Sequence, residues 1–220
     1  MRNNRKLTAV IWDWNGTLLD DVKVSLLSVN EELAARNLPQ ITEDFYRSHF
    51  DFPVKDFYQK LGINFSRDNF DEMSRRFLEI YFRNLQLATL HKGVKETLQY
   101  LRENGVRQYV LSAMEQKRLD NMLAGYGIDH FFDKIQGLGD IYADGKRSAG
   151  EKLMKTILPD KSSAWMVGDT LHDLEVAEAM GIQCVLLSSG HQTRERLLRR
   201  HDLVVDNFHE LKTFFAGMLR

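Results

Sequence analysis

The chain has little of several features that mark particular classes of protein. It contains one cysteine and three prolines in 220 residues, so no disulfide can form within it. Thirty basic residues nearly balance thirty-one acidic ones, for a formal net charge of −1. This balance disfavours nucleic acid and anionic membranes as partners.

Long apolar runs are also missing. No run approaches the roughly 20 residues that a membrane span needs, and the N-terminal segment reaches Asp13 before a signal-peptide core could form. We therefore expect a cytoplasmic protein without a membrane partner, present as a monomer or homodimer. Cys184 lies in an apolar run and is expected to be a buried thiol. The seven histidines show no metal-ligand spacing, so we expect them at the surface or at helix caps.

What is present, with 43% apolar residues, is an alternation of short apolar runs and helical patterns. The runs predict buried strands at 8–12, 108–111, 164–167, 184–187 and 203–205. Between them, apolar residues recur at helical spacing, as in Val94, Leu98 and Leu101. The alternation predicts an α/β fold, a doubly wound parallel sheet with helices on both faces.

The segment from about residue 21 to 91 breaks this alternation. It has helical periodicity, for example Leu26, Val29 and Leu33, but no convincing strand. We interpret it as an inserted all-helical cap domain, so that residues 1–20 and 92–220 form a discontinuous core domain. The basic run 194–201 is interpreted as a solvated helix face.

Polar residues follow the predicted strands. Asp13 and Ser112 end the first two, Lys146 lies in a loop after Gly139, and Asp169 and Asp173 follow the strand at 164–167. Ligands of open parallel sheets bind beyond the carboxyl ends of the strands, so we expect these groups to converge. Clustered carboxylates repel one another unless a cation lies among them, and Mg²⁺ suits a set of oxygen ligands best.

Four motifs in this order resemble those of the haloacid dehalogenase-like (HAD) superfamily. The stretch "DWNGTLLD" from Asp13 is similar to its first motif, usually DxDGT, and Ser112 to its second. Lys146 is similar to the third motif and "GDTLHD" from Gly168 to the fourth. The resemblance spans nearly the whole chain, and the helical insertion resembles the C1 cap of the phosphoglycolate phosphatase-like group.

The resemblance implies a phosphatase that hydrolyses a small phosphorylated metabolite. Asp13 would be the nucleophile and would form an aspartyl-phosphate. Ser112 and the backbone amides of Trp14 and Ala113 would bind the transferring phosphoryl group, and Lys146 would neutralise it.

The same resemblance implies a Mg²⁺ site. Asp13, Asp169 and the main-chain carbonyl of Asn15 would hold the ion, and Asp173 would orient them directly or through a neighbour. Gly16 would permit the tight turn between them.

Asn15 departs from the family pattern, because the usual aspartate there protonates the leaving group and an amide cannot. Four explanations are open. His49 or Lys55 of the cap supplies the proton; the substrate has a good leaving group such as an acyl phosphate; the asparagine was introduced to trap a complex; or the protein binds phosphorylated ligands without turnover. A further alternative is a phosphonoacetaldehyde hydrolase-like enzyme that uses Lys55 as a Schiff base.

Substrate selection is assigned to the cap. Arg47, His49 and Lys55 flank an aromatic stretch, and we predict that they contact an anionic or polar leaving group.

Overall fold

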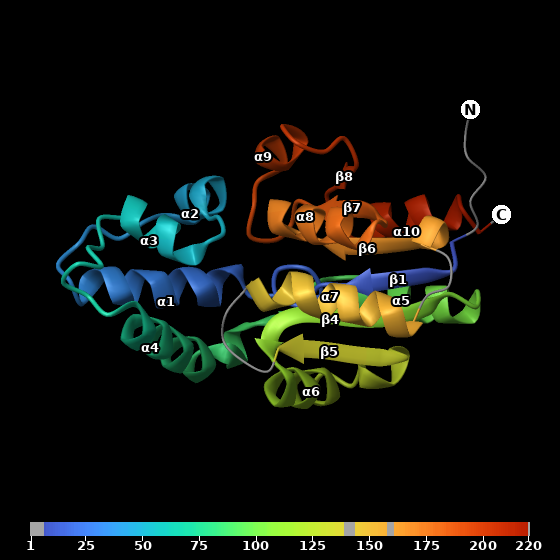
Figure 1. The fold of residues 1–220 in the computed structure, drawn as a ribbon, viewed down its shortest axis with the longest axis horizontal. Coiled ribbons are helices and arrows are strands. Elements are labelled where there is room, and N and C mark those ends of the chain that lie inside the picture. Colours follow the sequence, from blue (N-terminus) through green and yellow to red (C-terminus); the bar gives the residue numbers. More distant parts are fainter. Residues whose placement is uncertain (1–6, 139–143, 158–160, 220) are drawn as a thin grey trace.

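A six-stranded parallel sheet lies at the centre of the protein (Figure 1). The structure is a computed structural model that describes residues 7–138, 144–157 and 161–219. The strands lie in the order β5-β4-β1-β6-β7-β8, and the predicted fold class is confirmed. Their bounds are β1 Ala9–Trp12, β4 Arg107–Glu115, β5 Lys134–Leu138, β6 Ala164–Gly168, β7 Gln183–Leu187 and β8 Val204–Val205.

The apolar runs form strands because both faces of the sheet are covered. Val10 and Trp12 of β1 point into one apolar core, and Ala9 and Ile11 point into the other. The first core is closed by α5 (Val94–Glu103), α6 (Gln116–Gly125) and α10 (Phe208–Ala216). The second is closed by α7 (Asp144–Ile157), α8 (Leu171–Met180) and α9 (Arg194–Leu198).

Two details of the sheet differ from the sequence prediction. The strand predicted at 108–111 continues to Glu115, with an irregular register after Leu111. Strand β5 was missed, because its sequence KIQGL mixes polar residues and glycine with apolar ones and offers no continuous run.

The helical segment lies beyond the carboxyl ends of the strands, at the left of Figure 1. It contains α1 (Val22–Ala34), α2 (Glu43–His49), α3 (Val54–Lys60) and α4 (Phe70–Arg83), which share a separate apolar core. A short antiparallel pair, β2 (Leu19–Asp20) with β3 (Thr89–Leu90), joins the chain where it leaves and returns to the sheet. The division into a cap domain at 21–91 and a two-part core domain stays a prediction.

The order of the strands fixes where a ligand can bind. From β1 the chain moves outward to β4 and β5, and it then crosses to β6, β7 and β8 on the other side. The crevice where this order reverses lies at the carboxyl end of β1. None of the helices in the described ranges is long and apolar enough to cross a membrane.

Candidate active site

Strand register brings three predicted site residues to one edge of the sheet. Trp12 of β1 lies opposite Val110 of β4 and Val167 of β6. Asp13 therefore follows one residue beyond this level, and Ser112 and Asp169 follow two residues beyond it. Trp14 and Ala113, whose amides we predict to bind phosphate, are the next residues along the chain.

Ser112 does not end its strand as predicted. It is buried inside β4, where the register with β5 becomes irregular, and its Oγ accepts a hydrogen bond from the amide of Met114 at 3.1 Å. At this irregularity the backbone around Ser112 departs from regular pairing with β5, and the strand then continues to Glu115. The hydroxyl hydrogen of Ser112 can then be donated to a ligand.

Three carboxylates converge at this edge. One oxygen from each of Asp13, Asp169 and Asp173 lies within 4.8 Å of the other two, and all three residues are buried. Lys146 places its Nζ 2.5 Å from Asp13 Oδ1 and 2.7 Å from Asp173 Oδ1. The lysine lies on α7, not in a loop as predicted, so a helix holds it in place.

This cluster has three carboxylates and one lysine, so negative charge is in excess. Burial raises the pKa of Asp13 to about 8 against the attraction of Lys146, while Asp173 and Asp169 raise it further. Burial also raises the pKa of Asp169 to about 6, and the neighbouring charge of His191 opposes the rise. Burial would raise the pKa of Asp173 too, but Lys146 outweighs it and the pKa is lowered. A further cation among these oxygens would favour the ionised forms.

The donors fit Mg²⁺, which prefers oxygen ligands and takes few carboxylates. Asp169 receives one hydrogen bond on each oxygen, from Thr17 Oγ1 at 3.0 Å and the His191 amide at 2.6 Å, and each oxygen keeps a lone pair. Asp173 is more fully engaged. Its Oδ1 accepts from Lys146, and its Oδ2 accepts from the Thr170 hydroxyl and amide as part of the cap of α8. These contacts favour an orienting role for Asp173.

Close packing around Asp169 explains why position 16 is a glycine. This glycine has φ +72°, and a Cβ there would lie 2.2 Å from Asp169 Oδ2 and 2.5 Å from His191 Cδ2. A Cβ on Gly190 would lie 2.3 Å from the same carboxylate oxygen. Two glycines therefore let the backbone enclose Asp169.

Asn15 is hydrogen-bonded to Asp21, the residue just before α1, and to Tyr81. Asn15 Nδ2 donates to Asp21 Oδ2 at 2.8 Å and to Tyr81 Oη at 2.9 Å. Tyr81 in turn donates to Asp21 Oδ2 at 2.7 Å, and the Gly16 amide donates to Asp21 Oδ1 at 2.7 Å. Asp21 is the N-cap residue of α1, but its side chain makes no cap hydrogen bond.

His191 completes this group, contrary to the expectation that histidines lie at the surface or at caps. It is buried, with Nε2 3.3 Å from Asp21 Oδ1 and Nδ1 3.0 Å from Tyr46 Oη. Burial opposes its charge, but Asp21 outweighs it and raises the pKa of His191 to about 9. Burial likewise opposes ionisation of Asp21, yet His191, Tyr81 and Asn15 together lower the pKa of Asp21. One signal was present in the sequence, since "SSGH" follows a strand at the same edge.

Comparison with known proteins identifies the family of this chain. A family model described as haloacid dehalogenase-like hydrolase matches residues 10–187. The chain belongs to the haloacid dehalogenase-like hydrolases. The predicted enzyme class, a phosphatase of this family, is confirmed.

Among its relatives are phosphoglycolate phosphatases. That of Haemophilus influenzae is 28% identical, with 96% of this chain and 99% of the relative covered. That of Pectobacterium atrosepticum is 27% identical, with 94% and 92% covered. A predicted phosphoglycolate phosphatase from Haemophilus somnus has a similar fold, with a TM-score of 0.72 at 24% identity and 97% and 99% of the two chains covered. Protein tyrosine kinase A of Mycobacterium tuberculosis also has this fold, with a TM-score of 0.78 at 22% identity and 96% and 98% covered.

The cap residues predicted for this hydrolase are not brought to the carboxylates. Arg47 donates to the backbone carbonyls of Gly190, at 2.8 Å, and Ser188. His49 is exposed and stacks on Phe45. Lys55 Nζ lies 5.5 Å from the centroid of Phe65, among residues of α3 and the following loop.

The basic run 194–201 is not only a solvated face. Arg196 NH2 lies 2.6 Å from the Asp51 carboxylate, and its NH1 donates to the Phe50 carbonyl at 2.5 Å. Arg196 thus attaches the segment after α2 to α9, and Arg47 attaches α2 to the loop that carries His191. In this hydrolase the cap is therefore fastened to the core beside the site.

Proposed function

We propose that the chain is a Mg²⁺-dependent phosphomonoesterase that transfers the phosphoryl group of a small phosphorylated metabolite to Asp13. The observation that carries this proposal is the buried ion pair of Asp13 with Lys146, beside the carboxylates of Asp169 and Asp173. Asp13 lies at the end of a central strand, so its position is fixed for attack in line with the leaving group.

The remaining groups have distinct roles. Ser112 and the amides of Trp14 and Ala113 bind phosphoryl oxygens, and Lys146 balances charge on the nucleophile and the phosphate. Asp13, Asp169 and the carbonyl of Asn15 would hold Mg²⁺, which supplies charge stabilisation to the transferring phosphoryl group when bound.

Asn15 determines which leaving groups the enzyme can release. Its amide offers no proton to a leaving alkoxide, and general acid catalysis is worth about 10²- to 10⁴-fold in rate. Positioning and charge stabilisation supply most of the acceleration of phosphoryl transfer and do not need this proton. The enzyme should therefore act best on aryl or acyl phosphates, whose leaving groups depart without assistance.

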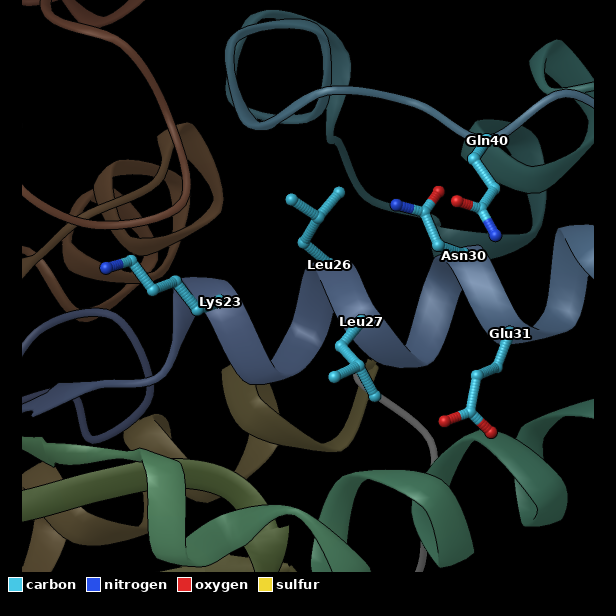
Figure 2. Close-up of a pocket in the computed structure, with 6 residues that line it drawn as sticks. All are labelled: Lys23, Leu26, Leu27, Asn30, Glu31 and Gln40. Atoms are coloured by element: carbon cyan, nitrogen blue, oxygen red, sulfur yellow. The ribbon is translucent and has the colours of Figure 1, made fainter.

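An open depression along α1 is the proposed site for the rest of the substrate. It has a volume of about 360 Å³ and is lined by Lys23, Leu26, Leu27, Asn30, Glu31 and Gln40 (Figure 2). Lys23, two residues after Asp21, lies at its end nearest the core. This depression is open to solvent, and the exposed Lys23 is available there for a second anionic group of the substrate. Phosphoglycolate, the compound in the names of the relatives, is an alkyl phosphate, so it tests the predicted preference for leaving groups that need no proton.

The test is phosphate release with and without Mg²⁺. Wild type should hydrolyse p-nitrophenyl phosphate only with Mg²⁺, and Asp13→Asn should be inactive. A panel of acyl, aryl and alkyl phosphates, including phosphoglycolate, then ranks the leaving groups. Turnover by Asp13→Asn equal to that of wild type would contradict the proposal.

A second function, binding of phosphorylated ligands without turnover, is favoured by Asn15 alone. It predicts ligand affinity with no phosphate release from any member of the panel. The phosphonoacetaldehyde hydrolase alternative gains no support, because Lys55 is paired with Phe65 and Phe70 in the cap.

A further inference from the structure

Asp21 collects an unusual number of hydrogen bonds for one side chain. Its carboxylate is 1% exposed and has two partners on each oxygen. Gly16 N and His191 Nε2 meet Oδ1, and Asn15 Nδ2 and Tyr81 Oη meet Oδ2. These partners come from the first motif, the cap helix α4 and the loop after β7. A carboxylate only accepts hydrogen bonds, so every partner must donate.

This arrangement fixes the orientation of the Asn15 amide. Nδ2 must face Asp21, since Oδ1 would meet an acceptor there, and its two hydrogens are used by Asp21 and the oxygen of Tyr81. The amide can therefore offer a ligand only Oδ1, an acceptor. Residue 15 is a fixed donor to Asp21 and cannot donate to a leaving group.

We propose that Asp21 is a positioning residue, because its carboxylate requires a hydrogen-bond donor at position 15. Asn15 and Asp21 therefore act as one unit. A general acid at position 15 works only if Asp21 is also replaced. This inference rests on the proposed phosphatase function. It explains why position 15 holds an asparagine, which the proposed activity alone does not explain.

The hydrogen-bond directions predict the outcome of each single substitution. Asn15→Asp alone would place two carboxylates in the position of a 2.8 Å hydrogen bond. Asp21→Asn alone would either place two amide nitrogens together or, after a flip, turn an NH₂ group toward the Gly16 amide. Each single variant therefore loses at least one favourable contact in a buried site.

The double variant restores the match of donors and acceptors. The new amide at position 21 still accepts from Gly16 and His191 through its oxygen, and its nitrogen donates to the new carboxylate at position 15 and to the oxygen of Tyr81. The Tyr81 hydroxyl then donates to that carboxylate. Every hydrogen bond is kept, and those among positions 15, 21 and 81 reverse their direction.

The experiment is a double-mutant cycle with wild type, Asn15→Asp, Asp21→Asn and the double variant. Asp20→Asn is the matched control, because it removes the same charge from the adjacent, exposed residue. Thermal unfolding in EDTA measures the coupling without metal or substrate. Turnover is measured on p-nitrophenyl phosphate and on an alkyl phosphate, whose leaving group needs a proton.

Both single variants should unfold at lower temperature than wild type and Asp20→Asn, and the double variant should recover most of the loss. Each single variant should lose on the order of 10-fold in kcat/KM on p-nitrophenyl phosphate. The double variant should exceed wild type about 10²-fold in kcat on the alkyl phosphate, with a smaller gain on the aryl ester. A purely structural role for Asp21 would not change this dependence on the leaving group.

The inference is overturned if Asn15→Asp alone gains as much on the alkyl phosphate as the double variant does. It is also overturned if the two substitutions are additive in unfolding temperature, or if the double variant does not fold. Absence of turnover in all five proteins would instead contradict the proposed function, and the unfolding cycle would still measure the Asn15–Asp21 coupling.

Discussion

Replacing Lys146 by methionine tests the charge balance of the site. The lysine makes two buried ion pairs, at 2.5 Å and 2.7 Å, and its side chain is 5% exposed. Removing one partner of a buried pair costs about 3–5 kcal/mol, because the other charge is left without compensation. In a chain of this length, that corresponds to a fall in Tm of about 6–20 °C. Methionine keeps the length of the stem, so little packing is lost.

The loss should depend on pH and on metal. Lys146 holds down the pKa values of Asp13 and Asp173, so both rise when it is removed, and these carboxylates bind more protons in the folded variant than in folded wild type. Its stability relative to wild type should therefore fall as the pH rises from 6 to 9. Added Mg²⁺ should restore part of the loss, since it supplies positive charge to the same oxygens.

Urea unfolding at several pH values, with EDTA or Mg²⁺, measures this effect. Lys152→Met is the control, because Lys152 is an exposed lysine of the same helix. A loss below about 1 kcal/mol, as for surface ion pairs, or one that responds to neither pH nor Mg²⁺, would refute the charge argument.

Three further substitutions follow from the site. Asp169→Asn should weaken Mg²⁺ binding by about 10-fold or more in calorimetry, and unchanged affinity would count against it as a ligand. His191→Gln should be less stable than wild type below about pH 6.5. The difference in stability should shrink as the pH rises through about 9, because wild-type His191 then loses the proton that binds Asp21. A difference in urea unfolding that does not change with pH would argue against that ion pair. Lys55→Met should keep kcat within about 2-fold, since the Nζ of Lys55 lies over the rings of Phe65 and Phe70 in the cap. A large loss of kcat would indicate that Lys55 acts in the active site.

Much of the fold was predictable because both faces of the sheet are buried. Such strands appear as short apolar runs, and the runs at 164–167 and 184–187 match β6 and β7 closely. Strand β5 lies at the edge of the sheet, where burial is incomplete and the run is interrupted by Gln136 and Gly137. Periodicity carries little information at such positions.

The carboxylates were predictable for a topological reason. Parallel strands end at one edge, so Asp13 and Asp169 had to meet once their strands were identified. The partners of Asn15 were not predictable in this way. Asp21, Tyr81 and His191 meet through the docking of the cap on the core, which strand and helix patterns do not specify.

The role predicted for Arg47, His49 and Lys55 in substrate selection stays a prediction, and their contacts could not be foreseen from the sequence. Charge near an aromatic stretch cannot show which way a helix turns, and Arg47 turns toward backbone carbonyls instead of the carboxylates. The open depression along α1, with Lys23 at the core end, is formed by the packing of the cap and has no sequence signal.

Mapping the phosphorylated residue after an acid quench tests the central claim most directly. Wild type turning over an aryl or acyl phosphate with Mg²⁺ should yield, by mass spectrometry, a phosphorylated peptide containing Asp13, and hydroxylamine should remove the label as expected for an acyl phosphate. A stable phosphoryl group on any other residue, or turnover with Asp13 never labelled in rapid-quench samples, would contradict the account.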